Sequence, residues 1–294
     1  MIHDDFRHQL LGYFDALRER VATESGDWTV KGFIDVYRRI YTISLDTKVL
    51  SKVLELVMFP VIQQFAVDNG YRLVLAKQQN QYPDLTLVSP DGIHYAVDIK
   101  TTYRKRRDKS SVARVNGMTL GTYMGYFRAR DNSSIITFPY NSYSKHYVLG
   151  VVYSQVADKD EMRSYNISEL DDIPSVANEF EFFLQEKYRI ASDRPGSGNT
   201  KNIGSTVYLD RLIEGTGVFS SLGVEIFDDY WMNYRNNEMA KAEGFGTPPY
   251  SNLFEYKDHK KRGAAIVDIP EVSLRSEANE ADVAPEDENG DLSF

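Results

Sequence analysis

The chain contains no cysteine, which excludes disulfides, thiolate catalysis and any zinc or iron–sulfur site held by cysteine. It also lacks a long hydrophobic segment, since no apolar run approaches the roughly 20 residues that span a bilayer. Its five histidines are scattered without the spacing of metal ligands. The first residues, Met1 to Asp5, show no signal-peptide pattern. We therefore expect a cytoplasmic protein that does not enter a membrane.

The formal net charge is −9, which would repel a polyanion such as DNA. The charge is unevenly distributed, however. Residues 268–294 hold nine acidic residues and one basic residue, Arg275, so residues 1–267 carry a formal charge of only −1. Few large apolar residues occur in this tail, as is typical of disorder. We therefore expect one domain over residues 1–267 and an acidic disordered tail over residues 268–294.

Basic residues gather in two runs, from Arg104 to Lys109 and from Lys257 to Arg262. Either run could supply the sequence-independent part of an affinity for DNA. Solvated surface loops are the alternative interpretation of both.

Two carboxylates and a lysine fall on two neighbouring predicted strands. Asp84 follows Pro83 and begins the alternating segment 84–88, a turn cluster covers 89–92, and residues 93–100 alternate again. Because residues two apart on a strand share a face, Asp98 and Lys100 project to one side while Ile99 points into the apolar layer. Pairing of the strands in a hairpin would bring Asp84 alongside Asp98.

Two acidic side chains suit a hard cation such as Mg²⁺, which binds through one or two carboxylates plus substrate phosphate. The pattern favours hydrolysis of a phosphodiester, with Asp84, Asp98 and the Ile99 carbonyl as ligands of Mg²⁺. Lys100 would then orient the attacking water and offset charge in the transition state. A salt bridge on an exposed hairpin is the alternative interpretation of an isolated Asp-x-Lys.

The remaining periodicity is compatible with one α/β unit. Asp46 is a plausible N-cap for a helix that runs toward Asp68 and carries an apolar face. Other segments are less distinctive. The pattern predicts helices over 6–21 and 179–187, strand and turn over 28–43, strands over 71–76 and 146–153, and a core position for Trp231.

Four segments occur in the same order and at similar spacing as in the EcoRV-like type II restriction endonucleases, which this chain closely resembles. These segments are residues 44–51, 77–84, 97–103 and 196–205, and weaker matches extend the likeness from about Leu45 to about Tyr256. The resemblance implies an α/β fold with a restriction-endonuclease-like PD-(D/E)xK core, in which helices flank a mixed central sheet. Residues 1–267 would then be the endonuclease domain.

The resemblance also implies roles for residues outside the motif. It places Glu55 in the catalytic and metal-binding region. It implies contacts with the DNA backbone or minor groove for Lys48, Gln78, Gln79, Asn80, Thr102, Asn202 and Tyr234. It assigns base reading in the major groove to the glycine-rich loop, which consists of Gly196, Ser197, Gly198, Asn199 and Thr200.

Because this loop agrees throughout with that of the resembling family, the resemblance implies cleavage of double-stranded DNA at GATATC or a nearly identical site. Cuts at GAT/ATC would leave blunt ends with 5′-phosphates. A palindromic site further implies a two-fold homodimer, and a restriction enzyme implies a cognate DNA methyltransferase. The alternatives are a structure-selective PD-(D/E)xK repair nuclease, which has no need of the loop, and a noncatalytic DNA-binding protein, in which the acidic pair would be broken.

Overall fold

The computed structural model describes residues 5–78, 80–105, 112–131, 134–156, 163–196, 201–260 and 275–276. Within these residues, the α-helices are α1 (Asp5–Leu11), α2 (Phe14–Val21), α3 (Thr47–Asp68), α4 (Lys187–Ile190), α5 (Leu209–Glu214), α6 (Val224–Asn233), α7 (Asn237–Ala242) and α8 (Leu253–His259). The short 3₁₀ helices are η1 (Gly125–Phe127), η2 (Tyr140–Ser142) and η3 (Ile167–Asp172).

The strands form three sheets. The five-stranded central sheet has the order β3 (Arg72–Leu75), β4 (Leu85–Val88), β5 (His94–Tyr103), β7 (Tyr143–Gln155) and β9 (Ala177–Glu186). One three-stranded sheet contains β1 (Gly32–Ile34), β2 (Arg39–Thr42) and β8 (Ser164–Asn166). The other contains β10 (Ala191–Pro195), β11 (Asn202–Ser205) and β6 (Thr119–Thr122).

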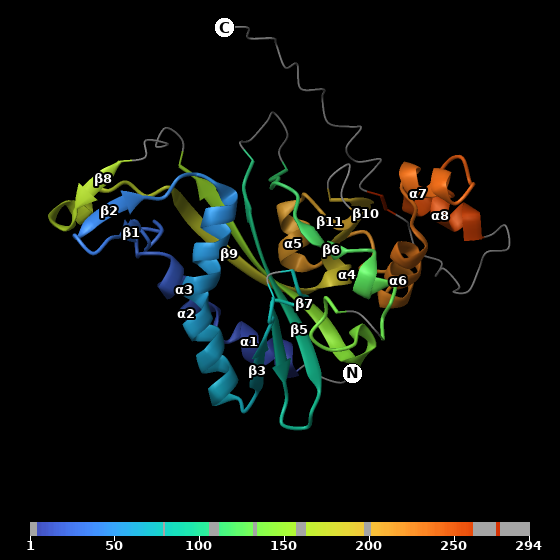
Figure 1. The fold of residues 1–294 in the computed structure, drawn as a ribbon, viewed down its shortest axis with the longest axis horizontal. Coiled ribbons are helices and arrows are strands. Elements are labelled where there is room, and N and C mark those ends of the chain that lie inside the picture. Colours follow the sequence, from blue (N-terminus) through green and yellow to red (C-terminus); the bar gives the residue numbers. More distant parts are fainter. Residues whose placement is uncertain are drawn as a thin grey trace, which may run out of the picture.

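The central sheet is mixed, since β5 and β7 are parallel whereas the other neighbouring pairs are antiparallel. Helices α1, α2 and α3 lie on one side of it, and β6, β10, β11 and the helices from α4 onward lie on the other (Figure 1). The predicted α/β core with helices around a mixed sheet is confirmed.

Alternation along β5 divides the hydrophobic core into two layers. Val97 and Ile99 pack with the N-terminal helices in one cluster of buried residues. Ala96 belongs to a second cluster, which is built with the C-terminal half of the chain. Asp98 and Lys100 therefore project toward the second layer while Ile99 anchors the strand in the first, as the period of two predicts.

Helix α3 begins where the sequence predicts. The Asp46 carboxylate accepts hydrogen bonds from the backbone N–H groups of Lys48 and Val49, at 2.8 and 3.1 Å. These bonds satisfy two of the donors that a helix start leaves free. The cap fixes the first turn of the helix that carries Glu55.

Among the described residues, α3 is also long and apolar enough to span a membrane by length and composition alone. The sequence shows no uninterrupted apolar run of this length because Lys48, Lys52 and Glu55 lie within the helix. Leu50, Leu54 and Met58 are fully buried against the central sheet, so α3 is a core helix of this fold.

The helix predicted over residues 179–187 is wrong. Residues 177–186 form the strand β9, and only Lys187–Ile190 is helical. Glutamate, leucine and glutamine favour helices, but Phe180, Phe182 and Leu184 alternate along the chain and pack on one face. Backbone pairing with β7 decides the outcome.

The single helix predicted over residues 6–21 is instead two helices, because the chain turns at Gly12 and Tyr13 between α1 and α2. The predicted strands over 28–43, 71–76 and 146–153 are confirmed by β1, β2, β3 and β7. Trp231 is fully buried, which confirms its predicted core position.

Packing across the sheet generates the first prediction. A Cβ atom at Gly150 on β7 would collide with the ring of Phe183, which is itself buried. Gly150→Ala must displace this ring and is expected to lower the free energy of unfolding by about 1–3 kcal/mol in a urea titration. At Gly117 a Cβ would meet Val207 at an ordinary 3.6 Å, so Gly117→Ala is the control, with an expected change within about 0.5 kcal/mol. Equal losses in the two variants would contradict this account.

Candidate active site

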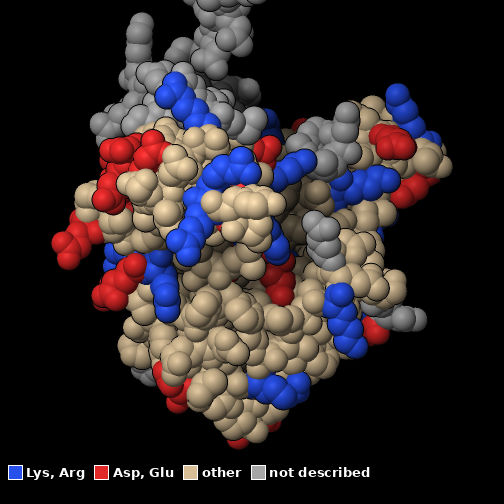
Figure 2. Space-filling view, turned by 60° about the vertical axis from the view of Figure 1, so that its left-hand side comes forward, with Lys and Arg blue, Asp and Glu red and all other residues tan. Residues whose placement is uncertain are grey.

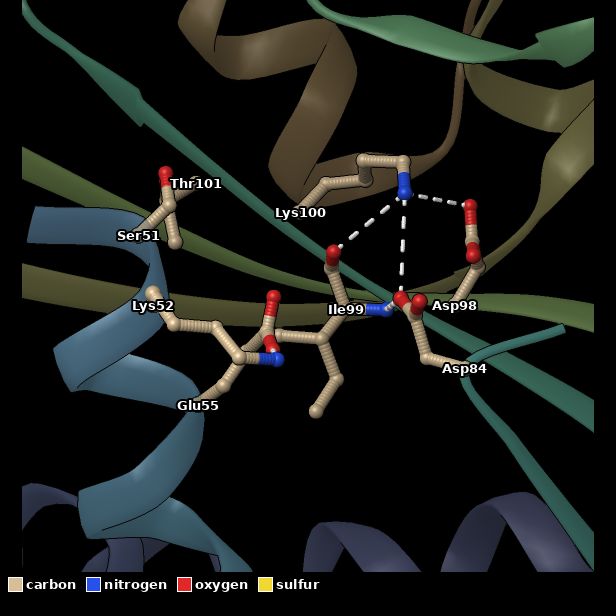
Figure 3. A network of polar contacts seen from close by, with 8 residues as sticks. All are labelled: Ser51, Lys52, Glu55, Asp84, Asp98, Ile99, Lys100 and Thr101. Atoms are coloured by element: carbon tan, nitrogen blue, oxygen red, sulfur yellow. Dashed lines mark hydrogen bonds and ion pairs between the residues drawn. The ribbon is translucent and has the colours of Figure 1, made fainter. Parts of the chain in front are cut away.

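The hairpin of β4 and β5 brings the two predicted carboxylates together. Leu85 pairs with Val97 in the antiparallel register, so Asp84, one residue before β4, lies next to Asp98. The backbone N–H of Ile99 donates a hydrogen bond of 2.8 Å to Asp84 Oδ2, which fixes the Asp84 side chain against β5. Figure 3 shows both carboxylates beside the same stretch of β5.

Lys100 reaches both carboxylates from the next position on that face. Its Nζ lies 2.6 Å from Asp98 Oδ2 and 3.8 Å from Asp84 Oδ2, and it donates a hydrogen bond of 3.3 Å to the Ile99 carbonyl (Figure 3). The side chain of Asp98 is 6% exposed, whereas those of Lys100 and Asp84 are 24% and 35% exposed. Asp98 is thus the buried member of the site, and the other two can reach a ligand.

The two carboxylates differ in their proton affinity because their surroundings differ. Burial and the neighbouring charge of Asp98 raise the pKa of Asp84 to about 7, although Lys100 acts in the opposite direction. Burial also disfavours ionised Asp98, but the ammonium groups of Lys100 and Lys187 outweigh it and hold the pKa of Asp98 below its usual value. The pair therefore contains one firmly ionised carboxylate and one whose charge is poorly compensated.

Such a pair fits a hard divalent cation. Carboxylate and carbonyl oxygens are the donors that Mg²⁺ prefers, and a cation would relieve the raised pKa of Asp84. Among the described residues, no group of three or more histidine or acidic side chains forms a metal cage. A site with two carboxylates suits Mg²⁺, which keeps waters and completes its coordination with phosphate oxygens.

Glu55 approaches the site from α3. Its carboxylate forms an ion pair of 2.5 Å with Lys52, and one pocket is lined by Glu55, Ile99 and Lys100 together. Ser51 on the same helix face shares a short hydrogen bond with Thr101 of β5. This bond joins α3 to β5 and holds Glu55 at the edge of the site, beside the Ile99 carbonyl rather than in contact with the carboxylates (Figure 3).

A second pocket connects the carboxylates to β6 and β11. Its lining includes Asp84, Asp98 and Lys100 together with Thr119 and Thr122 of β6 and Asn202 of β11. Figure 2 shows a hollow in this part of the surface with acidic side chains at its bottom and lysine and arginine side chains around it. The hollow therefore combines an acidic floor, which would attract cations, with basic side chains that would attract phosphates.

The loop predicted to read bases follows β10 and precedes β11. Gly196 is described, and its N–H donates a hydrogen bond of 3.0 Å to the Asn202 carbonyl, which closes the base of this loop. Ser197, Gly198, Asn199 and Thr200 lie outside the described residues, as does Gln79. Asn202 pairs with Thr122, so the base of the loop adjoins the pocket of the carboxylates.

The other predicted DNA contacts occupy different positions. Lys48 lines the pocket near Glu55, Asn80 lines the pocket of the carboxylates, and Gln78 lines a third pocket that Asp84 and Glu55 share. Thr102 is buried, and its hydroxyl donates to the Asn116 carbonyl at 2.5 Å. Tyr234 is buried in the aromatic cluster around Trp231. Their contacts with DNA stay predictions.

The basic runs are only partly described. Arg104 pairs with Glu181 at 2.8 Å, and residues 106–111 lie outside the described residues. In the second run, Lys260 is buried and pairs with Asp229. Lys260 therefore anchors the C-terminal helices, while Lys261 and Arg262 lie outside the described residues.

The sequence pattern does not single out Lys187, which is buried and whose charge favours ionised Asp98. Nor does it single out Tyr82, whose ring stacks on Tyr126 with centroids 4.7 Å apart and whose hydroxyl lies 2.9 Å from His146 Nδ1. Lys187 fell within the segment predicted as a helix, where a lysine looks solvated. The position of Tyr82 directly before Pro83 and Asp84 was the available signal.

A mixed sheet that presents Pro-Asp on one strand and Asp-x-Lys on the next defines a nuclease of the restriction-endonuclease-like class. The family model described as restriction endonuclease EcoRV matches residues 24–261. The chain is also 38% identical over 244 residues to the type II restriction enzyme EcoRV of Escherichia coli, an alignment that covers 82% of this chain and 94% of that protein. The chain therefore belongs to the EcoRV family of type II restriction endonucleases, which are site-specific deoxyribonucleases.

Proposed function

We propose that this enzyme is a Mg²⁺-dependent endonuclease that cleaves double-stranded DNA at GATATC, at the central step GAT/ATC, and leaves blunt ends with 5′-phosphates. The observation that carries the proposal is the shared pocket. Asp84, Asp98 and Lys100 line it together with Asn202, and Asn202 closes the loop whose sequence from Gly196 to Thr200 agrees with that of the resembling family. Hydrolytic groups and base-reading loop thus adjoin in one chain.

In the proposed reaction, Asp84, Asp98 and the Ile99 carbonyl hold Mg²⁺ and Glu55 borders it. Bound there, Mg²⁺ supplies positive charge that polarises the phosphodiester and activates water. Lys100 faces the same space, so its ammonium orients the attacking water and offsets negative charge on the phosphate in the transition state. The water oxygen bonds to phosphorus and the bond to the 3′ oxygen breaks. The 3′ oxygen takes up a proton and leaves as a hydroxyl.

The positions of the predicted contacts suggest how the duplex enters. Lys48, Gln78 and Asn80 line pockets on the two sides of the Asp84–Asp98 pair, and we propose that they bind the DNA backbone or minor groove with Gln79, Asn202 and Tyr234. Thr102 is buried beneath this surface, so its part in backbone binding would need its hydroxyl to leave Asn116. Bending at the central TA step would bring the scissile phosphate to the carboxylates.

A two-fold dimer would give each strand of the palindrome its own site. The sheet of β1, β2 and β8 supplies a candidate surface at one end of the molecule (Figure 1). Phe33, Ile34, Val36 and Tyr37 are each more than half exposed, and exposed large apolar side chains that gather in one place mark interaction surfaces. We propose that a second copy of the chain covers them.

We further propose that residues 1–267 form the endonuclease domain and that the acidic tail over 268–294 is dispensable. The enzyme would act in the cytoplasm beside a DNA methyltransferase, because an unmodified six-base site would otherwise expose the host genome to cleavage.

Digestion of DNA tests the specificity. We expect a plasmid with one GATATC, incubated with the purified protein and Mg²⁺, to be linearised with blunt ends at GAT/ATC, while a matched plasmid without the site stays intact. Asn199→Ala should lose this site preference because the amide no longer bonds base edges, at about 1–3 kcal/mol for each lost contact. Cuts at another sequence, or unchanged cleavage by the variant, would contradict the role of the loop.

The carboxylate pair is tested by Asp98→Ala. Without this ligand, cleavage should fall by about a thousandfold or more, because several kcal/mol of charge stabilisation are lost and each 1.36 kcal/mol is tenfold in rate. Binding of a GATATC duplex in Ca²⁺, measured by fluorescence anisotropy, should persist because the reading loop is intact. A variant that cleaves normally would refute the assignment, and one that loses only DNA binding would indicate a binding role.

The proposed dimer is tested by Phe33→Glu. Two such charges at a two-fold interface are desolvated and repel one another, so sedimentation should show a dimer for the wild-type protein and a monomer for the variant at the same concentration. The monomer should cut both strands more slowly. Val224 is similarly exposed on α6, far along the chain from this sheet, and Val224→Glu is the matched control. A variant Phe33→Glu that remains dimeric would exclude this surface.

A further inference from the structure

Strand β10, which leads into the base-reading loop, carries a bulge. Ala191 pairs with Ser205 and Pro195 pairs with Ile203, so β10 holds extra residues between these two pairs. Bulges of this kind turn a side chain away from the direction that regular pairing would give it, and they gather beside functional sites. Residues 192–194 form the bulge, directly before the loop.

The backbone of the bulge is held by the C-terminal helices. Asp193 is fully buried, and its carboxylate accepts a hydrogen bond of 3.0 Å from the N–H of Leu253 at the start of α8. Its carbonyl accepts one of 2.7 Å from the Tyr230 hydroxyl on α6. The N–H of Arg194 donates a hydrogen bond of 3.0 Å to Ser192 Oγ. The peptide between Asp193 and Arg194 is therefore fixed from both sides.

The side chain of Arg194 points out of this fixed backbone. A Cβ atom at Gly204 of β11 would lie 2.6 Å from the Arg194 carbonyl oxygen, so the two backbones are in close contact on the inner side. The Arg194 side chain is exposed, and within the described part of the chain the structure gives its guanidinium no hydrogen bond or ion pair. A guanidinium has five N–H donors in a planar fork that matches a phosphate group. Arg194 thus offers an anion a charged group on a rigid support.

A second exposed cation stands at the other end of the loop. The Lys201 carbonyl accepts hydrogen bonds from the Thr122 hydroxyl at 2.8 Å and from the Tyr123 N–H at 3.0 Å. The side chain of Lys201 is exposed, and among the residues that the structure describes its ammonium has no hydrogen bond or ion pair. Arg194 and Lys201 therefore follow the same design, a fixed backbone and an unengaged charge, on either side of the loop.

The surroundings of the loop show why cations are useful there. Residues 196–200 contain no charged side chain, and residues 1–267 carry a formal charge of −1. A loop that enters the major groove, which is about 12 Å wide, lies between two phosphate chains. Contacts with phosphates fix the register of a protein on the duplex, and arginine and lysine supply most of them.

We propose that Arg194 and Lys201 form a phosphate clamp, in which each binds a backbone phosphate beside the major groove that the loop reads. The clamp rests on the proposed reading of DNA by this loop. It supplies sequence-independent affinity, and it fixes the depth at which the uncharged loop meets the base edges.

The salt dependence of DNA binding tests the clamp. The Kd of a GATATC duplex is measured in Ca²⁺ by fluorescence anisotropy at several salt concentrations, for the wild-type protein, Arg194→Gln, Lys201→Gln and the double variant. Each phosphate contact that is lost should make the slope of log K against log salt concentration shallower by about 0.9, and the double variant should lose about twice that. Arg194→Lys should keep the wild-type slope because it keeps the charge.

Arg72→Gln is the matched control. Arg72 is exposed on β3 and pairs with Val88, at the end of the β3–β4 pair away from Asp84. Its removal changes the net charge by the same amount, so an unchanged slope separates a phosphate contact from a general effect of charge.

The base pairs that flank GATATC supply the second readout. A phosphate contact carries no sequence information, so the change in Kd on Arg194→Gln should be the same whether G·C or A·T pairs flank the site. A change that depends on the flanking pairs would mean that Arg194 reads bases and would overturn the clamp. Wild-type slopes in both single variants would overturn it as well. A wild-type protein without preference for GATATC would contradict the proposed specificity instead, and the slopes on the duplex that it binds would still decide the clamp.

Discussion

The rest of this structure depends on the close approach of the Asp84 and Asp98 carboxylates in a partly buried pocket. Their mutual repulsion, together with burial, raises the pKa of Asp84 to about 7. The charges of Lys100 and Lys187 offset this cost by holding the pKa of Asp98 below its usual value, and the Ile99 N–H ties Asp84 to the backbone of β5. A cation that binds both carboxylates would relieve this repulsion, so the close approach of the two carboxylates favours cation binding.

The sheet explains how such a site can be built precisely from few residues. Ile99 is buried with the N-terminal helices while Asp98 and Lys100 on either side of it face the opposite layer. A shift of one residue in the pairing of β4 with β5 would turn both functional groups into the apolar layer. The long parallel pairing of β5 with β7 therefore positions the chemistry as well as stabilising the core.

The sequence predicts those parts of the fold that depend on local chemistry. The cap at Asp46 and the hairpin around residues 84–100 could be predicted because helix capping and strand alternation depend on residues that are close together in the sequence. Strand β9 could not, since its glutamates and leucine have helical propensity and its long ladder of hydrogen bonds is made with β7, about thirty residues away in sequence. The same error concealed Lys187. It is the first residue of the short helix α4, and the turn out of β9 buries its side chain against the ring of Tyr82.

The candidate base-reading loop and the candidate hydrolytic site are connected by the backbone of β11 and β6 as well as by side chains. Gly196 and Asn202 close the loop that resembles the base-reading loop of the family, and Asn202 pairs with Thr122 of β6. Strand β6 also contains Gly121, whose φ of +91° brings the backbone close to the Tyr126 hydroxyl and to Lys187. A side chain at position 121 would collide with Tyr126, so glycine permits β6 to pack closely against the Tyr126 ring. Gly121, Tyr126 and Asn202 line one pocket together with Asp84 and Asp98, so the strands at the base of the loop form a wall of the pocket that holds the carboxylates.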